Sequence, residues 1–501
     1  WAVLAAPLAG AEVVPAFLPG MSSSTTEGVA KFKPPPRPES LRASVLFLHG
    51  ALALVVLFFV AAGEMMKHPV PEGKFMKKDG TLIDLTAFDP VELGPYPKCH
   101  PRHGEYELVS ESGNRTWAKI KDAPSAGPFP AGHPENPEFL AKRDAEAKRD
   151  AKQDMFRWKG LQPSLHLLTL ATLCVFLGAK HGVWIFTASE VGEDGIAAEA
   201  ATTTMLRKEE AYWIPVFGSV ALFSLFVVYK YLGSDWIKLL ISSYILLMCT
   251  LTFGTNVGNF VDVARDRATR PLFKVPYLDA NVTVYDIVGG IVGACMCWSY
   301  MATKNWIINN VFGLSFCLMG LKRIATSNLK TGGIMLVGLF LYDIFWVFGS
   351  KSVFGSNVMV TVAKGVEGPI KLMFPRSLNG CGELDFSMLG LGDIVVPGIY
   401  ISFMAKWDAV VQGSQKASSF VYLNSCMVAY VLSLVTTVAV MLLFNAAQPA
   451  LLYIVPYVMV TSAAVAFARG EFWELLAYEI PDEEEEAEKA KAAKVQEEKD
   501  K

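Results

Sequence analysis

Residues 417–468 read ASSFVYLNSCMVAYVLSLVTTVAVMLLFNAAQPALLYIVPYVMVTSAAVAFA, and none of these 52 residues carries a charge. A bilayer core about 30 Å thick is crossed by roughly 20 apolar residues in a helix. The stretch is therefore too long for one crossing and suits two, with the turn FNAAQP between them. It predicts a chain that crosses a membrane repeatedly.

Eight further stretches are nearly free of charge, which brings the predicted spans to ten. They are residues 45–63, 161–179, 211–229, 239–261, 287–303, 305–321, 331–350 and 386–405. The expected fold class is an all-α polytopic membrane protein with a nine-helix bundle, preceded by an N-terminal apolar segment and a polar luminal segment. The net charge of −3 favours no nucleic-acid partner.

Polarity divides the chain into five parts. Basic residues precede the first apolar run, which ends VAAGE, so both a cleavable signal peptide and a retained anchor remain open. The five parts are a leader at 1–40, the signal peptide or anchor at 41–63, a polar luminal segment at 64–160, the nine-helix domain at 161–476 and an acidic cytoplasmic tail at 477–501. Within the leader, translation could begin at Met21.

The distribution of Lys and Arg between the loops predicts the orientation, because cytoplasmic loops are enriched in both. If the polar segment is luminal, Asn114 in Asn-Arg-Thr is a glycosylation candidate. The cytoplasmic side then receives Arg207, Lys208, Arg265, Arg267, Arg270, Lys274, Lys322, Arg323, Lys330, Lys406, Lys416 and Arg469. The luminal side receives fewer, mainly Lys304, Lys351, Lys364, Lys371 and Arg376.

Two of the predicted spans each hold a single acid, Asp343 in 331–350 and Asp393 in 386–405. If both spans are helical and consecutive, each carboxyl lies roughly 12 Å from the luminal flank and roughly 20 Å from the cytoplasmic flank. A lone acid at this depth costs about 2.5 to 3.5 kcal/mol, which favours a functional pair over hydrogen-bonding between helices. Asp286 differs, because it opens its span and the helix dipole explains it.

Two neighbouring carboxyl groups in a low dielectric share one proton and titrate together. The ionised acid can take a proton from water while the protonated acid hydrogen-bonds the scissile carbonyl. The pattern thus points to an aspartic protease. A proton-coupled transporter is the main alternative, and a non-proteolytic protein that binds membrane clients is another.

Glycines and prolines flank the acids. Gly390 and Gly392 permit close approach of another backbone or plain helix packing. Pro449 leaves a carbonyl without its helical donor, so the segment from Gln448 could pair with an extended substrate, although a helix start with Pro in its first turn explains it equally well.

The cysteines and histidines indicate no metal or cofactor. Most of the eight cysteines lie in apolar spans, and the segment KCHPRHGEY is better explained as a polar loop than as a metal site. Cys99 and Cys381 fall in predicted luminal loops, where a disulfide could form.

The motifs YD at 342–343, GLGD at 390–393 and QPAL at 448–451, in this order, resemble the presenilin and signal peptide peptidase family of intramembrane aspartyl proteases. The stretches NWIINNVFGLSF (305–316) and PIKLMFP (369–375) extend the resemblance. It implies a nine-helix endoplasmic-reticulum enzyme that cuts type II transmembrane helices, including remnant signal peptides, within the membrane lipid.

The resemblance makes Asp343 and Asp393 catalytic and assigns supporting roles to eight neighbours: Tyr342, Gly390, Leu391, Gly392, Gln448, Pro449, Ala450 and Leu451. It implies no cofactor. The chain departs from the family before residue 161, where an extra apolar run and a long polar segment leave a later endomembrane compartment open. The sequence does not decide whether a homo-oligomer forms.

Overall fold

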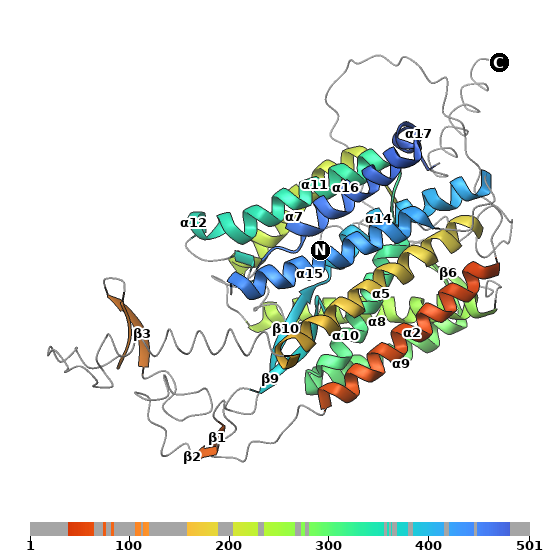
Figure 1. The fold of residues 1–501 in the computed structure, drawn as a ribbon. Coiled ribbons are helices and arrows are strands. Elements are labelled where there is room, and N and C mark those ends of the chain that lie inside the picture. The colour runs from red at the N-terminus through yellow and green to blue at the C-terminus, as the bar shows by residue number, and fades with distance from the viewer. Residues whose placement is uncertain are drawn as a thin grey trace, which may run out of the picture. The chain divides into compact units, whose positions relative to one another are not determined.

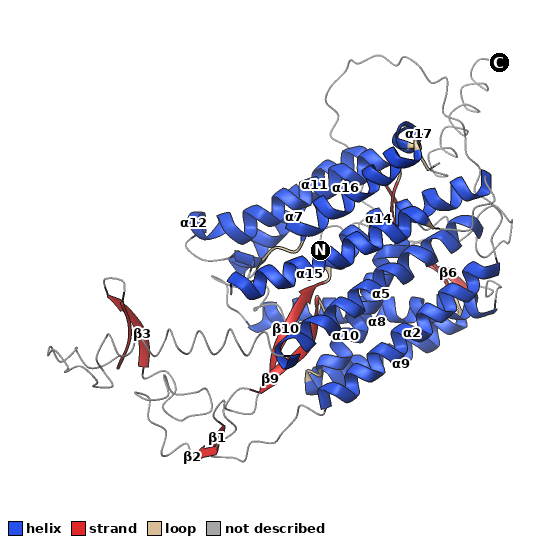
Figure 2. Cartoon of the chain, viewed as in Figure 1, coloured by secondary structure: helices blue, strands red, loops and turns tan. Residues whose placement is uncertain are grey.

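The computed structural model describes residues 39–64, 74–76, 82–84, 106–111, 114–119, 158–188, 204–228, 235–265, 272–275, 280–354, 358–359, 362, 368–378, 384–414, 420–444 and 448–480. Helices dominate these residues (Figures 1 and 2). They are α2 (Glu39–Glu64), α5 (Trp158–Ala188), α7 (Lys208–Val227), α8 (Asp235–Arg265), α9 (Val284–Thr303), α10 (Trp306–Arg323), α11 (Leu329–Ile344), α12 (Ser350–Phe354), α14 (Gly392–Ser414), α15 (Val421–Phe444), α16 (Leu451–Arg469) and α17 (Phe472–Ala477).

The strands are short and form five separate pairs. β5 (Thr204–Leu206) and β8 (Ile324–Thr326) pair in parallel, so the chain just before α7 lies beside the chain just after α10. The other pairs are β1 (Lys74–Met76) with β2 (Leu82–Asp84), β3 (Tyr106–Glu111) with β4 (Asn114–Lys119), β6 (Phe273–Val275) with β7 (Ala280–Val282), and β9 (Lys371–Leu378) with β10 (Leu384–Gly390).

Eight of the described helices are long and apolar enough to cross a membrane: α5, α7, α8, α9, α11 with the π-turn that follows it, α14, α15 and α16. A helix also occupies the predicted span 305–321, but Asn309, Asn310 and Lys322 make α10 more polar than the others. All three polar side chains are buried, so α10 is an interior helix. The all-α polytopic fold class is confirmed.

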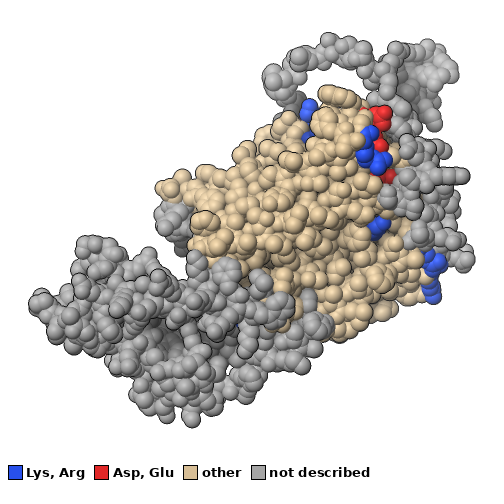
Figure 3. Space-filling view, viewed as in Figure 1, with Lys and Arg blue, Asp and Glu red and all other residues tan. Residues whose placement is uncertain are grey.

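α14 is the central helix of the bundle. Of the most apolar 18 residues of α14, 94% are buried. In the corresponding stretches of α7, α8, α9, α11, α15 and α16, 33% or fewer are buried. Helix α14 contacts α10, α11, α15 and α16. The outer helices turn large apolar side chains outward, such as Trp298 at 79% and Val460 at 67% exposure. Such a surface suits contact with lipid tails, and in Figure 3 the described charges lie towards the end near α17.

The predicted span 386–405 is wrong at its beginning. Residues Leu384–Gly390 form strand β10, and the helix starts only at Gly392. The apolar side chains of the stretch LDFSML satisfy a strand as well as a helix, and Gly390 and Gly392 are poor helix formers. The depth computed for Asp393 from a helical rise on its luminal side therefore does not hold.

Two lysines counted as loop residues are also placed differently. Lys322 lies in the last turn of α10 and donates a hydrogen bond to Asn256 Oδ1 at 3.2 Å. Lys406 lies inside α14 and is 6% exposed. Helices α10 and α14 thus both continue beyond the uncharged stretches from which they were predicted. The long side chains of Lys322 and Lys406 pack against neighbouring helices.

The chain forms two compact units, one made of residues 1–55, 168–372 and 389–501, and the other of 56–167 and 373–388. The residues 342–343, 390–393 and 448–451 all belong to the first unit. In the second unit, the His166 ring stacks on Phe374 with 4.2 Å between centroids.

Candidate active site

Asp343 is the penultimate residue of α11 and is only 3% exposed. Asn328 is the N-cap of this helix, and its side chain accepts a hydrogen bond from Thr331 N–H at 2.8 Å. Directly after α11, residues Phe345–Gly349 form a π-helical turn. Such a turn widens the helix by one residue and is frequent at functional sites. Here it separates the acid from the helical segment that follows.

An aromatic cluster holds this π-turn against α7. Trp346 is buried within the turn, and its Nε1–H donates to Ser219 Oγ on α7 at 3.1 Å. The Tyr342 ring lies 6.3 Å from the Trp346 ring, centroid to centroid, and packs against the same apolar cluster. The Tyr342 ring packs beside α7 at Gly218, where a Cβ would lie in ordinary van der Waals contact with it, 3.6 Å from Cε2. Tyr342 therefore positions the end of α11.

Asp393 is the second residue of α14, so it sits at the positive end of that helix dipole. The backbone carbonyl of Leu391 accepts hydrogen bonds from Ile394 and Val395 and starts the helix. A Cβ on Gly390 would lie 3.4 Å from Asp393 Oδ2, while one on Gly392 would meet nothing within 4 Å. The glycine at 390 thus leaves space beside the carboxyl group.

Pro397 leaves the backbone carbonyl of Asp393 without its helical donor, since proline has no N–H. The buried hydroxyl of Tyr430, on α15, donates to that carbonyl at 3.2 Å. This hydrogen bond ties the first turn of α14 to α15. Sequence reasoning missed Tyr430, although the position of Pro397 four residues after Asp393 signals that a replacement donor is required.

The two acids and the QPAL segment converge. The carboxyl groups of Asp343 and Asp393 interact electrostatically with each other. The backbone N–H of Leu451 donates a hydrogen bond to the Asp343 carboxyl. Among the described residues, Asp343 Oδ2 is buried and has no hydrogen-bond partner, which leaves this oxygen available to share a proton with the other acid.

The QPAL segment leads into a helix, but Pro449 lies before that helix and not in its first turn, where one of the two sequence interpretations placed it. Leu451 is the first residue of α16 and Ala450 is its N-cap, so Pro449 lies one position outside the helix. Pro449, Ala450 and Leu451 are buried, and Gln448 is half-buried. First-turn N–H groups have no partner within their own helix, and that of Leu451 is used by Asp343.

A second buried acid shows what a structural carboxylate looks like in this bundle. Asp408, 4% exposed near the end of α14, accepts backbone hydrogen bonds from Tyr422 at 3.1 Å and Leu423 at 2.7 Å. It satisfies the free N–H groups at the start of α15. Asp408 is thus explained by capping, which separates it from Asp343 and Asp393. Asp286 likewise caps α9 together with Thr283, as its position predicted.

Other predicted positions have a simpler outcome. Asn114 is the first residue of β4, paired with Glu111. Cys99, Cys381 and the histidines of KCHPRHGEY lie outside the described residues. The cysteines with free thiols in the described part are Cys174, Cys249, Cys295, Cys297, Cys317 and Cys426.

Known proteins share this region. The family described as signal peptide peptidase matches residues 198–482, a range that includes every residue of the site. Signal peptide peptidase of Homo sapiens is 35% identical over 334 residues, covering 62% of this chain and 82% of the human protein. The protein of the same name from Mus musculus is 35% identical over 328 residues. Intramembrane protease 2 of Caenorhabditis elegans is 37% identical over 259 residues, covering 48% of this chain and 53% of the nematode protein.

Proposed function

The chain belongs to the signal peptide peptidase family of intramembrane proteases, and we propose that Asp343 and Asp393 are its catalytic pair. The observation that carries the proposal is that the carboxyl groups of Asp343, at the end of α11, and Asp393, at the start of α14, lie close enough to interact electrostatically. Both carboxyl oxygens of Asp408 accept backbone hydrogen bonds from α15 and Asp286 caps its own helix α9, whereas Asp343 Oδ2 has no hydrogen-bond partner among the described residues.

The proposed reaction is hydrolysis through an activated water. Two acids in contact hold one proton between them. The ionised acid accepts a proton from water as the water oxygen attacks the peptide carbonyl, and the protonated acid donates to the carbonyl oxygen. Collapse of the tetrahedral intermediate breaks the C–N bond, and the amine leaves with a proton from the pair. Either aspartate can take either part.

The residues around the pair have positioning roles in this proposal. The N–H of Leu451 orients Asp343, and Tyr342 anchors the end of α11. Gly390, Leu391 and Gly392 set the start of α14 beside Asp393. Gln448, Pro449 and Ala450 place the first turn of α16, and their backbone is where an unwound substrate segment would pair.

The proposed substrates are type II transmembrane helices, including signal peptides left in the membrane. A helix in a bilayer satisfies its own backbone hydrogen bonds, so its peptide bonds are accessible only after local unwinding. The buried Asp343 at the end of α11 and the half-buried Asp393 at the start of α14 suit such a substrate better than a soluble one.

The proposed location is the endoplasmic reticulum membrane, with residues 64–160 in the lumen and the acidic tail in the cytoplasm. The contact between Arg42 and the last turn of α8 supports this topology, because it places the start of α2 at the same end of the bundle as Arg265. Glycosylation at Asn114 would follow. A glycosidase-sensitive change in gel mobility that persists in Asn114→Gln would contradict it.

Purified protein in liposomes with a labelled signal-peptide substrate tests the function. We expect two peptide products from the wild type, and none from Asp343→Ala or Asp393→Ala. Proton flux across the liposome membrane without cleavage would instead support a transporter. Binding of the substrate without either activity would support a client-binding protein.

A further inference from the structure

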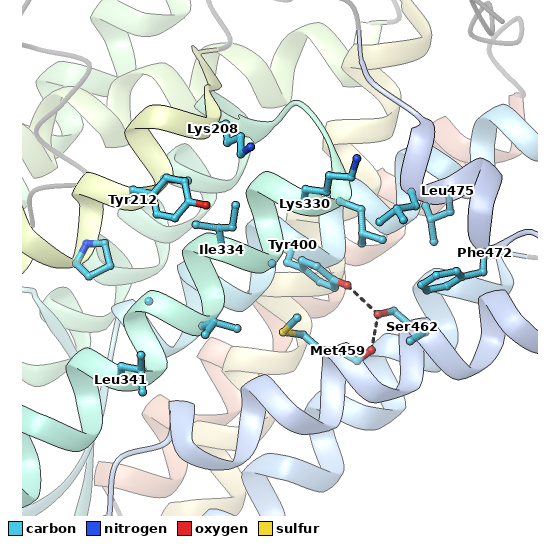
Figure 4. A pocket seen from close by; sticks show the side chains of 18 residues that line it. Lys208, Tyr212, Lys330, Ile334, Leu341, Tyr400, Met459, Ser462, Phe472 and Leu475 are labelled. Carbon is cyan, nitrogen blue, oxygen red and sulfur yellow. Dashed lines mark hydrogen bonds between the residues drawn. The ribbon is translucent and has the colours of Figure 1, made fainter. Parts of the chain in front are cut away.

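We propose that an anionic phospholipid of the cytoplasmic leaflet binds in a groove between α7, α11, α16 and α17. The groove has a volume of about 820 Å³ (Figure 4). Its floor is Tyr400 of the central helix α14, and its walls are mostly aliphatic. The proposal concerns a lipid site and goes beyond the proteolytic function.

The polar groups of the floor are already paired. The Tyr400 hydroxyl and Ser462 Oγ are 2.8 Å apart, and Ser462 Oγ also donates to the Met459 carbonyl at 2.9 Å. A ligand therefore finds little polar capacity along the body of the groove, which selects an apolar occupant such as an acyl chain. Gly333 leaves room between α11 and α16, since a Cβ there would meet only the end of Met459 at 3.5 Å.

The charge of the groove is confined to one end and has one sign. Of its 18 lining residues, only Lys208 and Lys330 are charged. They lie in the first turns of α7 and α11, and Figure 4 shows both at the end opposite Leu341. Within the described part of the chain, no salt bridge engages either ammonium group. A phosphate is the complementary partner of the two ammonium groups.

The length of the groove matches one leaflet. Lys330 and Leu341 are 11 residues apart on α11, which is roughly 16 Å at the helical rise. Half of a 30 Å hydrocarbon core is about 15 Å. A lipid with its phosphate at the lysines fits this length, whereas a transmembrane peptide would extend across both leaflets. The cytoplasmic leaflet also holds the anionic lipids.

The site is connected to the proposed catalytic pair through α11. Leu341, at the far end of the groove, precedes Asp343 by two residues. Close packing joins the groove walls, because a Cβ on Gly338 would lie 2.6 Å from Pro215 Cγ on α7. A bound acyl chain would therefore fill the space beside the helix that carries one of the two acids.

Native mass spectrometry of the full chain with dioleoylphosphatidylserine or dioleoylphosphatidylcholine tests the site. We expect one retained lipid with a preference for phosphatidylserine. The double variant Lys208→Gln/Lys330→Gln should lower that preference on the order of 30-fold, a factor of about five for each lysine near the membrane surface. The matched control Arg207→Gln/Arg265→Gln removes two cations outside the groove and should retain it.

Gly333→Leu provides a second test, because it fills the groove and keeps both lysines. We expect loss of the retained lipid with no change of charge. Equal retention of both lipids by the wild type, or an unchanged preference in the lysine variant, would overturn the proposal. Displacement by millimolar inorganic phosphate would assign the lysines to a free anion. A higher KM for the peptide substrate in the lysine variant, with lipid binding intact, would assign the groove to substrate instead.

Discussion

The backbone N–H of Leu451 donates a hydrogen bond to the carboxyl group of Asp343. The contact joins the start of α16 to the end of α11, and Asp393 at the start of α14 interacts electrostatically with the same carboxyl group. Three helix ends thus come together, although Asp343 and Leu451 are 108 residues apart along the chain. The free N–H groups and dipoles of two helix starts surround the acids there.

Replacing Leu451 by its α-hydroxy acid, which changes the amide into an ester, removes this N–H and keeps the side chain. We expect cleavage to slow by roughly 10-fold to 100-fold, because a hydrogen bond to a charged group contributes about 1.5 to 3 kcal/mol. The same replacement at Leu452 is the matched control and should be close to wild type. Equal rates for both esters, measured on one labelled substrate, would show that the donor does not orient Asp343.

Tyr430→Phe removes the hydroxyl that donates to the Asp393 carbonyl. The expected decrease in kcat is about fivefold, corresponding to a hydrogen bond of about 1 kcal/mol. Because Pro397 is the reason that this carbonyl lacks a helical donor, Pro397→Ala supplies a new N–H four residues later. The double variant Tyr430→Phe/Pro397→Ala should therefore regain part of the kcat that Tyr430→Phe loses. If Pro397→Ala makes the Tyr430→Phe enzyme slower still, Tyr430 acts by another route.

Several of these features were predictable from the sequence. Stretches without charge predicted the helices because a helix that crosses a bilayer must be apolar. Asp343 and Asp393 were recognisable because each is the single acid in such a stretch. The start of α14 was not predictable in this way. The apolar residues before Gly390 fit a strand or a helix, and the choice depends on the pairing of β10 with β9.

Contacts between residues far apart in the sequence were also not predictable from the sequence. Tyr430 lies in an uncharged helix where nothing distinguishes it from a packing residue until α15 is placed against α14. Asp408 lies beyond the predicted span 386–405, and its partners are the first N–H groups of α15. Both roles are set by tertiary packing, which local patterns do not encode.

The helix α2 is expected to remain in the mature protein. Arg42 Nε donates to the carbonyl of Val263 at 3.1 Å, within the last turn of α8. The His49 ring also lies 5.1 Å from the Phe260 ring, centroid to centroid. The intact mass of the purified chain should therefore include residues 39–64.

Arg42→Gln leaves that last turn of α8 without its donor, so it should lower the free energy of unfolding by about 1 to 2 kcal/mol. The exposed Arg207→Gln should leave the Tm unchanged. A mature protein that begins after Gly63 would show that α2 is a cleaved signal peptide.

Substrate helices that unwind easily should be cleaved faster. Gly, Ser or Asn within the span lowers helix stability by up to about 1 kcal/mol per residue relative to Ala. We expect a signal peptide with such residues to be cut several times faster than a matched helix in which they are Leu. Competition of the two peptides for one enzyme preparation gives the ratio of kcat/KM. A ratio near one would mean that unwinding does not limit the reaction.

The central claim is that Asp343 and Asp393 act as one unit, and cleavage by Asp343→Asn, Asp393→Asn and the double variant tests it most directly. Residues that act together lose nearly the whole rate when either is removed. The prediction is that each single variant loses as much activity as the double variant, with folding confirmed by an unchanged Tm. A single variant that still cleaves, or two partial losses that multiply in the double variant, would contradict a shared catalytic pair.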